Sequence, residues 1–188
     1  DGDPARFRML VTFDAQSDRQ DGGETREGVE TPSARASLTA SPAQPEVVMS
    51  DPFHLDRFVA AQADAWEGAL AELRRGRKTG HWIWFVFPQI AGLGQSATAQ
   101  FYGIGSLEEA AAYARHPVLG PRLIEAAEAL LAHAGTPAER ILGSLDAMKV
   151  RSSMTLFAIA VPEEGVFRRV LEVFFDGEGD PLTLGSLG

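Results

Sequence analysis

The 188-residue chain has no cysteine, which excludes disulfides, thiolate zinc sites and a cysteine nucleophile. It has no apolar run near the roughly 18 residues that a membrane-spanning helix needs, so we expect no membrane contact. Basic residues are scarce, with 17 Lys and Arg against 26 Asp and Glu, and the formal net charge is −9. Because an acidic chain repels phosphate backbones, we expect no nucleic-acid partner.

Familiar catalytic signatures are missing as well. The sequence contains no G-x-S-x-G, no Walker A motif and no G-x-G-x-x-G. The four histidines lie far apart in the chain, at His54, His81, His116 and His133. No two of them have the i, i+4 spacing that puts a pair of metal ligands on one helix. We therefore expect no metal and no cofactor.

The composition changes near Met49. Residues 1–48 are rich in polar residues, glycine and proline, and hold only two aromatic side chains, Phe7 and Phe13. Such a segment buries too little apolar surface to offset its ordering entropy, and it lacks the pattern of a secretory signal. We expect residues 1–48 to be a disordered tail or the product of a mis-assigned start, and residues 49–188 to form one domain.

The domain shows helical patterns from end to end. Apolar residues recur at i, i+3, i+4 and i+7 in a segment that begins at Asp51-Pro52, as N-cap and first helical residue, and ends before Gly76. This segment is one long helix or two helices with a joint near Ala63-Asp64. Further helices are predicted at 106–115 behind a capping box at Ser106, at 119–131, after a second capping box at Thr136 with Pro137 as the first helical residue, at 144–161, at 167–176 and after Asp180-Pro181. The predicted fold is all-α, a compact single domain of six to eight helices with short connections, preceded by the disordered segment.

The run 82–87 is entirely apolar. Periodicity does not distinguish a buried strand from a short buried helix here, but the neighbours are helical and no partner strand is evident, so we favour a buried helix. Its aromatic side chains fit a hydrophobic core. Alternatively, Trp82 and Trp84 line a ligand pocket with His81 and Gln89 as polar groups at its mouth.

Polar residues cluster in the predicted helix 144–161. Helical spacing places Asp146, Lys149 and Ser153 in one line. Ser152 falls on the apolar stripe with Met148, whose carbonyl we expect to accept its hydroxyl proton. The chain has two lysines and 15 arginines, which hints that Lys149 supplies a compact or titratable ammonium.

This cluster allows two interpretations. In the first, its two charged residues form a solvated ion pair beside hydroxyls that the helix itself satisfies. In the second, the helix faces His81 across a cleft, where His81 transfers protons while Lys149 and Arg151 hold an anionic group. Ser152 or Ser153 would then orient or attack the ligand.

The segment 74–78 is the one basic cluster in the sequence, with four Lys and Arg residues around Gly76. Cations there complete the C-terminal end of the first predicted helix on a solvated surface. Alternatively, they bind an anion or an acidic partner.

The distribution of these motifs resembles that of the bacterial domain-of-unknown-function 1810 family over about residues 50–184. The resemblance rests on Asp51-Pro52-Phe53, Arg57-Phe58, Ala61-Gln62, His81-Trp82, Phe87-Pro88-Gln89, Gly92-Leu93-Gly94, Tyr102-Gly103-Ile104, His116-Pro117-Val118-Leu119-Gly120, Asp146-Ala147-Met148-Lys149, Ser152-Ser153-Met154-Thr155-Leu156-Phe157 and Phe174-Phe175. It implies a compact all-α fold and no established activity. Some members carry the label "calpastatin", but inhibitors of that name are long, disordered and repetitive, unlike this aromatic-rich domain.

These observations favour a small helical binding or interaction domain. The first alternative is an enzyme that acts on a small polar or nucleotide-like metabolite at a His/Lys/Ser site, and the second is a regulatory accessory protein. The partner would be a small molecule or a protein whose identity the sequence does not give. We expect the protein to be cytoplasmic, and the sequence carries no signal for its oligomeric state.

Overall fold

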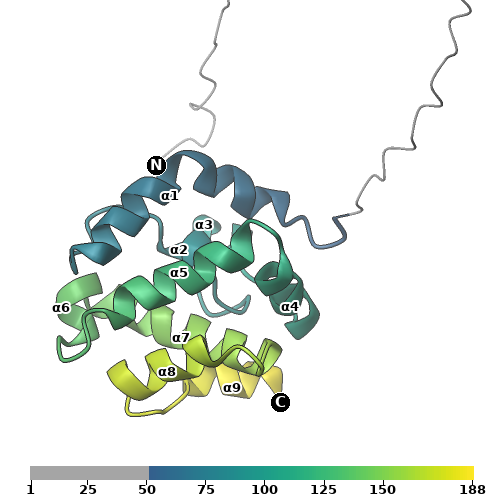
Figure 1. Cartoon of the computed structure of the whole chain (residues 1–188). Coiled ribbons are helices and arrows are strands. Elements are labelled where there is room, and N and C mark those ends of the chain that lie inside the picture. The colour runs from purple at the N-terminus through teal and green to yellow at the C-terminus, as the bar shows by residue number, and fades with distance from the viewer. Residues whose placement is uncertain (1–50) are drawn as a thin grey trace, which may run out of the picture. The chain divides into compact units, whose positions relative to one another are not determined.

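The computed structural model describes residues 51–188, and this part of the chain is helical without a strand (Figure 1). The expectations for residues 1–48 lie outside the described residues. The helices are α1 Asp56–Arg74, α2 Ile83–Val86, α3 Ala97–Phe101, α4 Leu107–Arg115, α5 Leu119–Leu131, α6 Ala138–Leu142, α7 Ser144–Ala160, α8 Gly165–Phe174 and α9 Pro181–Leu187. The all-α prediction is confirmed, and the described part holds nine helices, one more than the expected six to eight, because the short α3 was not predicted. Within residues 51–188, no helix has the length and apolar character needed to span a bilayer.

The first helix is a single one, but it begins at Asp56, four residues after the predicted first residue Pro52. Asp51 is not the residue that precedes α1; its carboxylate accepts a hydrogen bond from the backbone N–H of Asp56 at 3.0 Å. The segment between them turns sharply, with a φ of +53° at His54. At the other end, Gly76 has a φ of +67°, the left-handed conformation that glycine adopts most easily after a helix.

The core lies among the five longest helices. Figure 1 shows α5 crossing the middle of the described part, with α1 on one side and α7 and α8 on the other. A chain of rings joins these elements, with centroid separations of 5.0 Å between Phe58 and Tyr113, 5.5 Å from Tyr113 to Phe157, and 5.6 Å from Phe157 to Phe167. Aromatic pairs at such distances stabilise a core beyond the area that they bury.

The apolar run 82–87 forms the single turn α2, so the prediction of a short buried helix is confirmed. Pro88 cannot continue this helix, and the chain leaves it as a loop. That loop is tied to the segment after α3, because Ile104 donates its N–H to the Gln89 carbonyl at 2.9 Å and Ala91 donates to the Ile104 carbonyl at 2.8 Å. These bonds hold residues 89–94 against the body of the domain.

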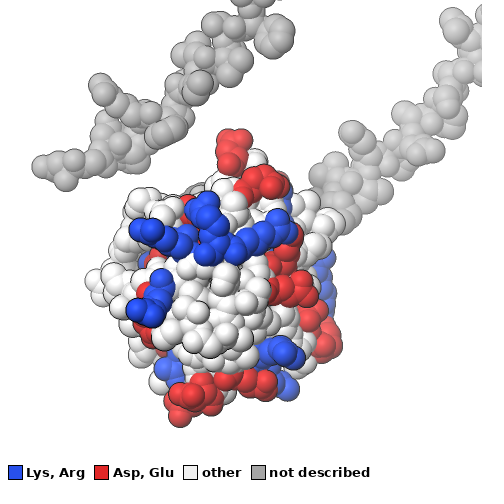
Figure 2. Space-filling model, turned by 60° about the vertical axis from the view of Figure 1, so that its left-hand side comes forward, with Lys and Arg blue, Asp and Glu red and all other residues white. Residues whose placement is uncertain are grey.

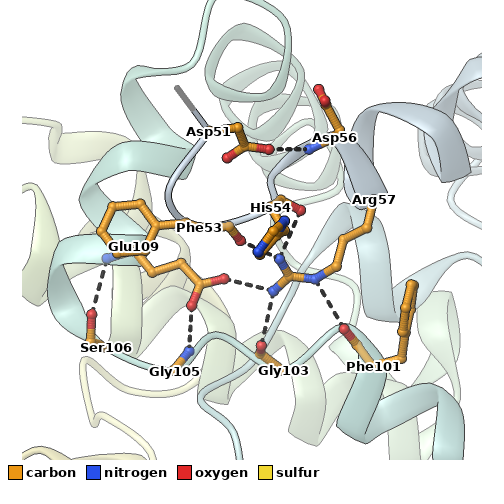
Figure 3. Close-up of polar contacts among 10 residues, drawn as sticks. All are labelled: Asp51, Phe53, His54, Asp56, Arg57, Phe101, Gly103, Gly105, Ser106 and Glu109. Atoms are coloured by element: carbon orange, nitrogen blue, oxygen red, sulfur yellow. Dashed lines mark hydrogen bonds and ion pairs between the residues drawn. The ribbon is translucent and has the colours of Figure 1, made fainter. Parts of the chain in front are cut away.

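Arg57 fastens the start of α1 to the start of α4 (Figure 3). Its guanidinium donates to the carbonyls of Phe53, His54, Phe101 and Gly103 and to the Glu109 carboxylate, the last at 2.6 Å. The planar five-donor fork of arginine suits such a convergence of acceptors. The Arg57–Glu109 pair is therefore a structural link between the two helices.

The two predicted capping boxes behave differently. At α4 the Ser106 hydroxyl accepts the N–H of Glu109 at 3.2 Å, as predicted, while the Glu109 carboxylate accepts the N–H of Gly105. At α6 the prediction is wrong, since Pro137 precedes the helix as its N-cap and no side chain caps it. The ring of Pro137 has no N–H and no acceptor, so it supplies only a suitable backbone angle.

Candidate functional site

The strongest concentration of sequence-predicted residues lies at the N-terminal half of α7. The Lys149 ammonium donates to Oδ1 of Asp146 at 2.7 Å, and Nζ of Lys78, which follows α1, lies 2.6 Å from Oδ2 of the same carboxylate. Burial opposes ionisation of Asp146, but the hydrogen bonds and charges of the two lysines hold the pKa of its carboxyl below the usual value. The only two lysines of the chain thus share one carboxylate, which leaves this cluster with one excess positive charge.

Each lysine also lies over a tryptophan of the aromatic run. The distance from Nζ to the ring centroid is 4.6 Å for Lys149 over Trp84 and 4.9 Å for Lys78 over Trp82, both within the range of cation–π attraction. Trp82 is buried in the core, whereas Trp84 is half-buried at its edge. Trp82 therefore lies in the core and Trp84 at the edge of the core beside Lys149, but neither tryptophan lines a hollow there, and the pocket interpretation stays a prediction.

Glu72 holds the loop that carries Lys78 and Trp82. Its carboxylate accepts hydrogen bonds from the N–H and hydroxyl of Thr79, from the N–H of Gly80 and from Nε1 of Trp82, at 2.6–3.0 Å. Burial alone would raise the pKa of the Glu72 carboxyl, but these four donors lower it to about 2. The carboxylate is therefore ionised at neutral pH and fixes the loop against α1.

Two hollows open beside Lys149. One, of about 210 Å³, lies between α7, the 89–94 loop and the start of α9; the other, of about 340 Å³, lies at the N-terminal end of α7. Lys149 and Leu145 line both hollows. We call the two hollows together the α7 groove.

The α7 groove gathers the most exposed apolar side chains of the described part. Leu145, Met148 and Leu182 are 74%, 64% and 68% exposed, more than any other large apolar residue within 51–188, and all three line the smaller hollow, the one near α9. Exposed apolar side chains that occur singly are ordinary, whereas these three lie together along one hollow.

Ser152 lines the groove but does not bond as predicted. Its hydroxyl lies 2.7 Å from the hydroxyl of Thr183 on α9, so the expected bond to the Met148 carbonyl is wrong. Thr183 in turn donates to the Asp180 carboxylate, which also caps α9 by accepting the Thr183 N–H. Helical back-bonding was a local expectation, and the arrival of α9 offers the hydroxyl a better-placed partner.

The remaining predicted residues lie around the cluster in different environments. Gln89 lines the groove with Lys149. Arg151 turns to Glu178, with its Nε donating to that residue's carbonyl at 3.0 Å. Ser153 is fully buried, and its Oγ is the one buried side-chain polar atom of residues 51–188 without a hydrogen-bond partner. His81 is exposed and lines neither hollow.

The structure therefore brings together part of the predicted site. Lys149, Asp146, Trp84, Gln89 and Ser152 share the α7 groove or its edge, while His81, Ser153 and Arg151 face elsewhere. Catalytic roles for any of them stay predictions. The arrangement shown offers a fixed ammonium, an amide and apolar walls, which are groups that bind and orient a ligand.

Sequence reasoning missed three contributors to this site. Lys78 was placed in the basic cluster 74–78 and not beside Asp146, although the rarity of lysine was a usable signal. Leu182 and Asp180 belong to the last helix, and nothing in their spacing indicated contact with α7. Contacts between segments more than 30 residues apart follow from packing and leave no trace in local periodicity.

The basic segment 74–78 lies next to the cluster through the Lys78–Asp146 pair. Figure 2 shows Lys and Arg side chains forming a band across one face of the described part. Arg75 and Arg77 are exposed, and Arg74 pairs with Glu125 at 2.8 Å.

Comparisons with known proteins give the following matches. A family model described as "Protein of unknown function (DUF1810)" matches residues 52–187. Among solved structures, the crystal structure of the conserved hypothetical protein Rv1873 from Mycobacterium tuberculosis is 49% identical, with a TM-score of 0.72, over 73% of this chain and 98% of that one. No curated protein matches the chain.

Proposed function

The chain belongs to the DUF1810 family, an all-α family without an established activity, and from that premise we propose that its domain is a protein-binding module. The α7 groove is the binding surface, and its occupant is a segment of a partner protein that combines apolar side chains with a carboxylate. One observation carries the proposal: the three most exposed large apolar residues within 51–188 line one hollow around the ammonium of Lys149. We place this activity in the cytoplasm, consistent with a chain that contains no cysteine.

The shape of the groove fits a peptide segment better than a compact metabolite. Small-molecule sites are usually single concave pockets of about 300–1,000 Å³. The hollow that holds the three exposed apolar residues, at about 210 Å³, is below that range, and it continues along α7 into the second hollow, so that Ser144 in one lies eight positions before Ser152 in the other. At 1.5 Å per residue this spans roughly 12 Å of helix, which matches three or four residues of an extended peptide.

The charges that line the groove favour a partner segment that carries a carboxylate. Lys149 and Lys78 exceed Asp146 by one positive charge, and the N-terminal end of α7, which no side chain caps, adds positive potential at the same end. Asp180, at the other end, directs its carboxylate to Thr183. A carboxylate of the partner is therefore expected at Lys149 and its apolar anchors at Leu145, Met148 and Leu182.

The Lys149 ammonium is suited to this role because it is held in place before binding. Asp146 and the Trp84 ring restrict its position, so little side-chain entropy remains to be lost when a partner arrives. The apolar residues supply most of the buried area, while the charge selects acidic over basic partners.

The proposal is tested by selection from a library of random 12-residue peptides displayed on phage, using the full chain as bait. We expect the selected peptides to combine Asp or Glu with Leu, Ile, Phe or Met. Leu145→Ser and Lys149→Glu are each expected to weaken their binding at least about tenfold, measured by fluorescence anisotropy.

Matched controls separate this site from general surface effects. Ile159→Ser removes an exposed apolar residue from the same helix outside the groove, and Arg169→Glu reverses an exposed charge on α8; both should bind as wild type. Peptides without an acidic and apolar pattern, or binding that survives Leu145→Ser, would refute the proposal. A dimer that Leu145→Ser dissociates in sedimentation experiments would identify a second copy of the chain as the occupant instead.

A further inference from the structure

A second pocket lies away from the α7 groove, between the segment that precedes α1 and the end of α4. Its volume is about 450 Å³, the largest of the hollows described here, and within the range of small-molecule sites. Its lining includes Asp51, Phe53, Asp56, Arg115, His116 and Pro117. The walls are mostly apolar, and the polar groups come from two segments more than 50 residues apart.

One wall of this pocket is held rigidly. Arg57 donates hydrogen bonds to the carbonyls of Phe53 and His54, at 2.6 and 2.9 Å, and anchors them to Glu109 on α4 (Figure 3). The Asp51 carboxylate is fixed by the N–H of Asp56 at 3.0 Å. A pocket whose walls are fixed in advance loses less entropy when a ligand binds.

The cationic side chains near the pocket each have an acidic partner. Arg115 pairs with Glu163 at 3.2 Å, and Arg57 pairs with Glu109. Nδ1 of His116 accepts the N–H groups of Val118 and Leu119, at 3.2 and 3.3 Å.

Nδ1 of His116 is therefore occupied as an acceptor within its own loop. The lining then carries the carboxylates of Asp51 and Asp56 and the guanidinium of Arg115, whose charge Glu163 partly offsets from outside the pocket. The N-terminal end of α1 contributes the equivalent of about half a positive charge. This is less than the negative charge of the two carboxylates, so the pocket keeps a negative potential.

We propose that this pocket binds a small organic cation, an ammonium group carried on an aromatic or aliphatic body. The apolar walls take the body, the Phe53 ring adds cation–π attraction, and the carboxylates of Asp51 and Asp56 attract the charge. This inference is independent of the proposed function, because no residue lines both this pocket and the α7 groove.

Three probes of one shape and different charge test the proposal: phenethylammonium, 2-phenylethanol and phenylacetate. Each is titrated into the ¹⁵N-labelled full chain, and amide shifts are followed by NMR at Leu55 and Ala112, which line the pocket. We expect the cation to bind most tightly and the anion most weakly. Added salt should reduce the difference between their affinities, because it screens exposed charges.

Variants then assign the effect to the carboxylates. Asp56→Asn is expected to weaken the binding of phenethylammonium about threefold, as for an exposed charge contact, and to leave the binding of 2-phenylethanol unchanged. Asp64→Asn makes the same change at an exposed position of α1 outside the pocket and should have no effect. Arg115→Gln removes a cation from the lining and should strengthen binding of the ammonium.

Several outcomes would overturn the assignment. Preference for phenylacetate would show that Arg115 and His116 dominate the pocket. Equal binding of the charged and neutral probes, or an Asp56→Asn variant that binds the ammonium as wild type, would show an apolar pocket without charge selection. Amide shifts at Leu145 in place of Leu55 would show that the probe binds in the α7 groove. No amide shift at either residue would exclude a cation site.

Discussion

The ammonium of Lys149 lies 4.6 Å from the centre of the Trp84 ring. This contact joins the polar line of α7 to the aromatic run that contains α2, two segments separated by about 60 residues in the sequence. With Asp146 as its second partner, the ammonium is held at the junction of two hollows. Lys149 is therefore a fixed charge on an otherwise apolar groove.

Removing the carboxylate of this cluster should cost more than removing its exposed lysine. Asp146→Asn leaves the ammonium groups of Lys78 and Lys149 close together without an anion, and Lys78 is only 8% exposed in its side chain. We expect a loss of about 2 kcal/mol in the free energy of unfolding. Lys149→Met keeps the Lys78–Asp146 pair and should cost under about 1 kcal/mol.

Urea denaturation of both variants checks this order. If Lys149→Met proved the more destabilising change, Lys149 would be a structural residue, and its availability to a partner would be in doubt. The order is expected to persist at moderate salt, because the Lys78–Asp146 pair is largely shielded from solvent.

Glu72 should make the free energy of unfolding depend on pH in the acid range. The pKa of its carboxyl is about 2 against an ordinary value of 4.5. The ionised form therefore stabilises the fold fully above about pH 4.5, and this contribution is lost as the pH falls toward 2. Glu72→Gln should lower the unfolding free energy at pH 7 by about 1–2 kcal/mol, allowing for solvent screening.

The measurement is a series of unfolding curves from pH 7 to pH 2. The difference between wild type and Glu72→Gln should shrink across the acid range, whereas Glu67→Gln, an exposed change on the same helix, serves as the control. A difference that stays constant with pH would show that the hydrogen bonds to Thr79 and Gly80 do not depend on the charge.

The two tryptophans should respond differently to truncation. Trp82 is 4% exposed, and Trp82→Ala is expected to cost about 3–5 kcal/mol, as for a large core residue. Trp84 is half-buried, and Trp84→Ala should cost about 1–2 kcal/mol because less apolar area is lost. Equal costs in thermal and urea unfolding would place Trp84 in the core and leave Lys149 without an aromatic partner at the surface.

Arg57 should not tolerate lysine. The guanidinium makes five hydrogen bonds from three nitrogens, and a single ammonium cannot reach the same set of acceptors. Arg57→Lys is expected to destabilise the fold by about 2–4 kcal/mol, while Arg168→Lys on the exposed side of α8 should be nearly neutral. A neutral Arg57→Lys would mean that the Glu109 charge alone holds the segment.

The long amphipathic helices were predictable because their local signals agree. α4 begins after Ser106 and ends before Pro117, and α7 occupies Ser144–Ala160 against a predicted 144–161. Where local signals compete, the prediction fails. Asp51-Pro52 has the composition of a helix start, but Arg57 holds the carbonyls of Phe53 and His54 in a turn, and the helix begins later.

Part of the candidate site was likewise predictable from the sequence. Asp146 and Lys149 were paired by helical spacing, since three residues bring two side chains onto one face of a helix. The Lys78 contact, the Thr183 partner of Ser152 and the exposed position of His81 were not predictable, because each depends on where another helix packs.

By itself the sequence determined the helical class, the position of most helices and the polar line on α7, since these follow from periodicity, caps and prolines within a few residues. Only the tertiary structure decided that both lysines share Asp146, that Leu182 joins Leu145 and Met148, and that Arg57 closes the wall of the second pocket. The physical reason is the sequence distance over which the two kinds of interaction act. Helix periodicity is set by hydrogen bonds four residues apart, whereas a binding surface is set by the packing of helices distant in sequence, where burial and hydrogen-bond satisfaction over the whole domain choose the partners.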